Sequence, residues 1–134
     1  MVGRNNPFNI RFSRNNQWIG QAGHTNGFVD FSEKIYGVRA AALLVLRSYR
    51  SKGILTISEI INRFAPSSEN NTAKYVEYVC TQLGVFPFDI PKNKDEYYKL
   101  LAAMSRFEGN PVSYAVIEFV CKYFHINPIN SRKK

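Results

Sequence analysis

The stretch NKDEYYKLLAAMSRFEGNPVSYAVIEFVCKYF, residues 93–124, contains the clearest fold signal in the chain. Asn93, with Glu96 three residues later, is typical of a helix start, and Gly109 is typical of a helix end. Asn110 precedes a proline, which predicts that a second helix starts there. Apolar residues recur at the spacing of one helix face in both halves: Tyr97, Leu100, Leu101, Met104, Tyr114, Ile117, Val120, Cys121 and Phe124.

Two more helices are expected upstream. Residues from about 35 to 50 contain a long apolar run and lead to Gly53, a residue suited to a left-handed helix end. Thr56 and Glu59 have the spacing of a capping box, in which each side chain accepts a hydrogen bond from the other residue's amide. Pro66 should close the helix that they open, because proline cannot continue a helix.

A further helix lies between these two pairs. Asn70 or Asn71 can cap it, Tyr75 and Val79 have helical spacing, and Gly84 marks its end. The chain therefore has five expected helices, and its expected fold class is mainly α.

Residues 1–31 look different, because they are rich in Asn and Gly with scattered apolar residues. Short alternating groups favour short strands or loops, and we expect a small hairpin through residues 17–21. Helices with a small β lobe and a plain helical bundle both fit this pattern. The expected organisation is a single domain over residues 1–134, divided into an irregular or β segment at 1–31, helices at 32–127 and a basic tail at 128–134.

The charge balance favours a polyanionic partner. Eighteen Lys and Arg against 10 Asp and Glu give a net charge of +8. Nucleic acid, teichoic acid, anionic lipid and anionic wall glycan are all compatible with it. The basic residues are dispersed and form no known nucleic-acid motif, so we do not expect nucleic acid as the partner.

The sequence predicts neither membrane insertion nor a secretory signal. The longest apolar run, Ala40–Leu46, is too short to span a bilayer, and the N-terminus lacks the apolar core of a signal peptide. We expect synthesis in the cytoplasm. If the protein acts in the periplasm or cell wall, or is carried in a virion, another agent must deliver it.

No metal or other cofactor is expected. Cys80 and Cys121 fall within expected helices and are interpreted as free core thiols, because a zinc site or disulfide scaffold needs more closely spaced ligands. His24 and His125 are in no recognisable catalytic context, which excludes a credible Ser/His/Asp arrangement.

Glu108 is the leading candidate for a catalytic acid. It follows Phe107 at the last turn of a helix and precedes a glycine. The negative end of the helix dipole and an apolar neighbour both raise a carboxyl pKa, which a glycosidic acid needs to hold its proton near neutrality. The glycine would leave room for a sugar. An ordinary exposed glutamate at a helix end is the alternative.

The second catalytic carboxylate has two candidates. Asp30 lies between two apolar residues, and Glu69 lies in a loop segment. Either could position a water molecule or stabilise positive charge on the sugar ring. Glu59 and Glu96 are already accounted for by helix caps.

Amides, a guanidinium and an aromatic ring gather near the N-terminus. Asn5, Asn6, Asn9, Arg11 and Trp18 form the kind of mixture that binds sugars. Amides bind hydroxyl and acetamido groups, and aromatic faces bind pyranose rings. Alternatively, the asparagines form turns and the tryptophan is a core residue.

The segment Asn5–Arg11 and the motif Trp18-x-Gly20 resemble the Asn-Asn-x-Phe-Gly-Ile segment and nearby Trp-x-Gly of bacterial glucosaminidases with a lysozyme-like fold. Here Asn9 replaces the glycine of that pattern. In those enzymes the catalytic Glu precedes this segment, whereas the comparable Phe107–Gly109 element comes near the C-terminus. The order suggests a circular permutation of a lysozyme-like core.

Over nearly its full length the chain is similar to small phage proteins described as virion structural or lysozyme-like. Gly37–Ala40, Arg63–Pro66, Glu69–Thr72 and Tyr75 contribute to that similarity. The resemblance implies a lysozyme-like fold, Glu108 as the acid, and Tyr75 among the residues that bind substrate.

Two functions from different classes remain open. The first is a peptidoglycan glycan-strand hydrolase, of muramidase or N-acetylglucosaminidase type, delivered by a phage particle or an antibacterial secretion system. The second is a non-catalytic virion structural or cell-wall-binding module on the same fold. The partners expected are glycan strands and proteins of the virion or secretion apparatus. A groove shared by Glu108, Trp18 and the Asn5, Asn6 and Asn9 amides would favour the enzyme.

Overall fold

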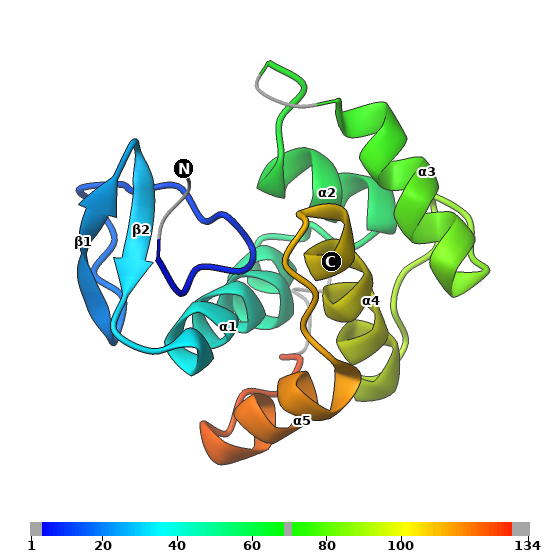
Figure 1. Ribbon diagram of the computed structural model, residues 1–134. Coiled ribbons are helices and arrows are strands. Elements are labelled where there is room, and N and C mark those ends of the chain that lie inside the picture. The colour runs from blue at the N-terminus through cyan, green and yellow to red at the C-terminus, as the bar shows by residue number, and fades with distance from the viewer. Residues whose placement is uncertain (1–3, 69–70, 130–134) are drawn as a thin grey trace.

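Five helices follow a small two-stranded hairpin in the computed structural model, which describes residues 4–68 and 71–129 (Figure 1). The first helix changes part-way into a π-helical segment. This arrangement confirms the mainly α fold class with a small β segment near the N-terminus. The elements are, in chain order, β1 (Gln21–Thr25), β2 (Phe28–Phe31), α1 (Lys34–Ala42), the π-helical η1 (Leu43–Tyr49), α2 (Ile57–Phe64), α3 (Thr72–Leu83), α4 (Lys94–Phe107) and α5 (Tyr114–Tyr123).

Local capping sets the starts of α2 and α4. The Thr56 hydroxyl accepts a hydrogen bond from the Glu59 amide at 3.0 Å, and the Glu59 carboxylate accepts one from the Thr56 amide at 3.0 Å. Asn93 accepts a hydrogen bond from the Glu96 amide at 3.0 Å. Both expected caps are therefore confirmed. Of the two candidates for α3, Asn71 is the cap, and Asn70 lies outside the described residues.

The expected cap of α5 at Asn110 is wrong. Ser113 caps this helix by accepting a hydrogen bond from the Val116 amide at 3.2 Å. Asn110 instead completes the end of α4. Its backbone amide donates to the Ser105 carbonyl at 3.1 Å, and Gly109 adopts a φ of 90°. These features form a Schellman motif, so Asn110 still belongs to the preceding helix end and cannot open the next one.

The hairpin also differs from expectation, because it does not pass through residues 17–21. β1 and β2 pair antiparallel around Asn26 and Gly27, whose φ angles are 52° and 86°. An Asn-Gly pair with positive φ is the preferred two-residue hairpin turn. The residues before β1 form a separate turn, in which the Gln21 amide donates to the Trp18 carbonyl at 3.1 Å.

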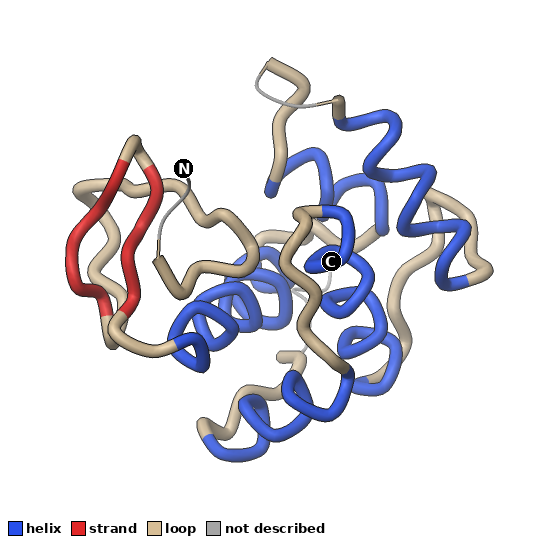
Figure 2. Tube along the Cα trace, viewed as in Figure 1, coloured by secondary structure: helices blue, strands red, loops and turns tan. Residues whose placement is uncertain are grey.

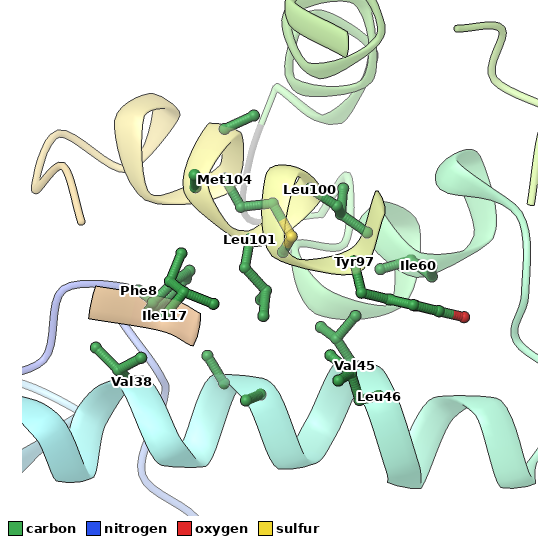
Figure 3. Packing of buried hydrophobic residues seen from close by; sticks show 14 of the residues in the cluster. Phe8, Val38, Val45, Leu46, Ile60, Tyr97, Leu100, Leu101, Met104 and Ile117 are labelled. Carbon is green, nitrogen blue, oxygen red and sulfur yellow. The ribbon is translucent and has the colours of Figure 1, made fainter. Parts of the chain in front are cut away.

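The core is built around α4. Figure 3 shows Leu101 of α4 pointing toward the long first helix, where Val45 and Leu46 of η1 lie below Tyr97 of α4. At the other end of this cluster Phe8 is fully buried beside Ile117 of α5. The N-terminal segment is therefore anchored in the same core as the helices.

Both cysteines lie in the core. Cys80 and Cys121 are buried free thiols, as predicted. None of the helices in residues 4–68 and 71–129 is long and apolar enough to cross a membrane. Across the same residues, no three His, Cys, Asp or Glu side chains gather in a way that could hold a metal ion.

Candidate active site

Glu108 meets the N-terminal segment at the end of α4. Its carboxylate accepts a hydrogen bond from the Asn9 side-chain amide at 2.8 Å, across 99 positions of sequence. The same amide lies 3.3 Å from the Glu108 carbonyl oxygen. In Figures 1 and 2 the segment before β1 passes between the hairpin and the helices. The chain thus brings Asn9 to the helix end that the sequence singled out.

A tight loop presents Asn9 to Glu108. The buried Asn6 amide donates to the carbonyls of Ile10 and Val29, both at 2.9 Å, and its oxygen accepts from the Ile10 amide at 2.9 Å. Asn9 itself has a φ of 53°, in the left-handed region that glycine and asparagine tolerate best. Asparagine is therefore suited to this backbone position.

The surroundings of Glu108 shift its pKa upward. The side chain is half-buried, and burial raises the pKa of Glu108, whereas hydrogen bonds from Asn9 and Tyr75 oppose this rise. Tyr75 is buried and stacks on Phe107 with 4.1 Å between ring centroids. The net result is a raised carboxyl pKa, the property that a general acid requires near neutrality.

Glu108 lines a cavity of about 380 Å³ between the hairpin region and the helices. A cavity of this size can enclose a sugar unit of a larger ligand. Glu108 is the carboxylate among the described lining residues. The complete lining is Asn9, Ile10, Arg11, Asn16, Trp18, Phe28, Leu44, Tyr49, Phe64, Ala65, Pro66 and Glu108.

The N-terminal wall of this cavity combines charge, aromatic surface and unpaired polar atoms. The Arg11 guanidinium lies 4.7 Å from the centre of the Phe28 ring. The Trp18 indole nitrogen and the Asn9 side-chain oxygen are buried without a hydrogen-bond partner among the described residues. An unpaired buried polar atom costs roughly 1–3 kcal/mol, so these two atoms lower the stability of the cavity wall.

Four of the other predicted site residues lie outside this lining. The Asn5 amide donates to the Phe31 carbonyl at 3.0 Å, and Asn6 stabilises its own loop. Asp30 accepts hydrogen bonds from the Arg4 amide and the Thr25 hydroxyl, both at 2.7 Å, and these hydrogen bonds lower its pKa. Tyr75 is buried, and its side chain forms a hydrogen bond with Glu108. Glu69 lies outside the described residues.

Sequence reasoning missed most of the helical wall. Leu44 and Tyr49 come from η1, and Phe64, Ala65 and Pro66 come from the end of α2. Burial raises the pKa of Tyr49 to about 12, so this hydroxyl remains neutral. The similarity to phage proteins had included Arg63–Pro66, which was a usable signal, whereas the apolar pattern of η1 resembles any buried helix.

Comparison with known proteins gives one informative match. No protein-family profile matches the chain. The chain is 34% identical over 121 residues to Protein P5 of Pseudoalteromonas phage PM2, and the alignment covers 85% of this chain and 74% of that protein.

Proposed function

This chain belongs to the family of Protein P5 of Pseudoalteromonas phage PM2, and we propose that it is a virion-associated hydrolase of peptidoglycan glycan strands. The reaction is glycosidic cleavage of muramidase or N-acetylglucosaminidase type, and Glu108 donates the proton. Membership of a phage family favours delivery by a phage particle over delivery by an antibacterial secretion system. The net charge of +8 suits an anionic cell wall.

The environment of Glu108 carries this proposal. A carboxyl with a raised pKa lines an open cavity with Asn9, Arg11 and Trp18. A glycosidic acid needs such a pKa because it must protonate the departing sugar oxygen and then recover the proton. The indole face offers an apolar surface to a pyranose ring.

A circularly permuted lysozyme-like core is part of the same proposal. Permutation predicts that the N-terminal asparagine segment lies against the catalytic helix end, although the two are far apart in sequence. The hydrogen bond between Asn9 and Glu108, and the presence of Arg11 in the same cavity, support this relationship.

The second catalytic group has two candidates, Asp30 and Glu69. Asp30 is hydrogen-bonded within the hairpin region, outside the cavity lining, which makes it the weaker candidate. Glu69 follows Pro66, a lining residue, by three positions. We propose Glu69 as the group that positions water, and Glu69→Gln should then lower the rate without weakening glycan binding.

A non-catalytic wall-binding or virion structural module is the second candidate. One observation favours it: Glu108 is the lone carboxylate in the described part of the cavity lining, whereas most glycosidases use two. Such a module would bind the same glycan through the same cavity and leave it intact.

Zymography on purified peptidoglycan separates the two candidates. The wild-type protein should clear the gel and release new reducing ends. Glu108→Gln keeps the shape of the side chain and should lose about 10²–10⁴-fold in rate, the usual contribution of general acid catalysis. Binding to cell walls should persist in this variant. A wild-type protein that binds several peptidoglycans and cleaves none would establish the binding module instead.

A further inference from the structure

A second cavity, of about 350 Å³, lies beside Glu108. It is lined by residues 5–7 and 109–111 together with Lys34. These are the continuations of the two segments that meet in the first cavity, since residues 5–7 precede Asn9 and residues 109–111 follow Glu108. The hydrogen-bonded pair of Asn9 and Glu108 lines the first cavity, and Gly109, the next residue after Glu108, lines the second.

The surface beside Glu108 is open to a ligand. Gly109 is exposed, and a Cβ atom placed on it would meet no other residue within 4 Å. The side-chain amide of Asn110 donates a hydrogen bond to the Pro7 carbonyl at 3.4 Å. This hydrogen bond is long and is easily exchanged for one to a ligand. A polymer that passes Glu108 can thus continue along this surface.

The lining of the second cavity carries a positive charge. Lys34, the first residue of α1, is the charged member of its lining. This lysine is exposed, and it forms no ion pair with any residue that the structure describes. The amides of Asn5 and Asn110 add polar surface around it. Such a site suits a hydrogen-bonding ligand that carries an anionic group.

We propose that this second cavity binds the glycan strand on the far side of the cleaved bond, and that Lys34 pairs with a carboxylate on that part of the strand. The inference rests on the proposed function. Glucosamine units of the strand are neutral, whereas muramic acid units carry a carboxylate on the lactyl group or on the attached peptide. Lys34 therefore directs the strand so that a muramic acid unit occupies the second cavity.

Binding to glycan strands with and without free carboxylates tests this proposal. Affinities are measured in the Glu108→Gln background, so that no strand is cut during the measurement. The ligands are soluble peptidoglycan strands and the same strands with carboxylates converted to neutral amides. Dividing the affinity for the carboxylate strands by the affinity for the amidated strands gives a ratio that reports the carboxylate contact. Adding Lys34→Ala should lower this ratio about tenfold, the size expected from the loss of one charge-assisted hydrogen bond.

Lys94→Ala is the matched control. Lys94 is likewise an exposed lysine at the first position of a helix, α4, and it lines neither cavity. Its removal should leave the affinity ratio unchanged. Equal ratios in the two lysine variants, or equal loss of affinity for both kinds of strand in Lys34→Ala, would overturn the proposal.

Two further measurements locate the carboxylate and distinguish this inference from the proposed hydrolase activity. In a peptide-bearing unit the lactyl carboxyl is bound in an amide, so a Lys34 effect on intact strands comes from peptide carboxylates or from units without peptide. Stripping by an amidase frees the lactyl carboxylates, and a Lys34 effect on stripped strands shows that a lactyl carboxylate can pair with Lys34. An effect that disappears assigns the contact to the peptide. A wild-type protein inert on zymograms, with Lys34-dependent binding retained, would overturn the hydrolase and support the carboxylate site.

Discussion

Glu108 is held by a side-chain amide from the other end of the chain. Asn9 donates to its carboxylate at 2.8 Å, which favours the ionised form, while burial favours the protonated form and raises the pKa. Asn9→Gly removes the amide and keeps a residue that accepts a φ of 53°. We expect the pKa of Glu108 to rise further. The alkaline limb of the pH–rate profile should then move to higher pH, because the acid stays protonated longer.

An NMR titration of the Glu108 carboxyl carbon measures this shift directly, whether or not the protein is catalytic. Asn26→Gly is the control, because Asn26 also has a positive φ, 52°, but lies in the hairpin turn outside the cavity lining. Its titration curve should match the wild type. A pKa of Glu108 that falls in Asn9→Gly would contradict the assigned role of the amide.

Local sequence indicated Glu108, whereas Asn9 was linked to it only through the expected permutation. A glutamate between Phe107 and Gly109 at a helix end is a short-range pattern, and it can be recognised without a structure. The contact with Asn9 depends on how Asn6 folds the N-terminal loop and how Phe8 anchors it in the core. Neither interaction leaves a local pattern. The sequence therefore indicated Asn9 as a candidate sugar-binding amide, but not its hydrogen bond to Glu108.

At the scale of elements, the connection between α4 and α5 offers a direct test. Ser113 accepts a hydrogen bond from the Val116 amide, so Ser113→Ala should lower the free energy of unfolding by about 1 kcal/mol. Asn110→Ala should cost less, because its side-chain amide makes only long contacts, at 3.4 Å, with the Pro7 and Glu108 carbonyls. Urea denaturation of both variants measures the difference. A larger loss in Asn110→Ala would restore Asn110 as the stabilising residue.

The helices were predictable where short-range chemistry decides their ends. The capping box at Thr56 and the cap at Asn93 involve residues three positions apart, and both were found. The Asn-Pro pair at Asn110 was misread because the left-handed Gly109 extends the end of α4 by one residue. The Asn26-Gly27 pair is the typical signal of a two-residue hairpin turn, so the position of the hairpin is predictable from the sequence. The π-helical form of η1 has no counterpart in the apolar pattern.

At the scale of the whole molecule, the cavity is formed by segments that no sequence window contains together. Its walls come from residues 9–28, from η1, from the end of α2 and from the end of α4. Four predicted residues reach it, Asn9, Arg11, Trp18 and Glu108, because each belongs to a recognisable local motif. The rest of the lining is apolar, and its position depends on how the helices pack.

A close contact between α1 and the N-terminal loop links the fold to this cavity. A Cβ atom on Gly37 would lie 2.4 Å from the Asn5 carbonyl oxygen and 3.0 Å from the Pro7 ring, so Gly37→Ala must displace this loop. Because the same loop carries Asn9, we expect both lower stability and a raised pKa of Glu108, although Gly37 lines neither cavity. Thermal unfolding and the NMR titration of Glu108 measure these two effects.

The double variant shows whether Gly37 acts through Asn9 or through general loosening of the fold. If Gly37→Ala raises the pKa of Glu108 by moving the Asn9 amide away, then Asn9→Gly has already removed that interaction. Adding Gly37→Ala to Asn9→Gly should therefore change the pKa little further, while stability still falls, because residues in one network do not act additively. Additive pKa shifts would show instead that the loop affects Glu108 by another route, such as a change in its burial.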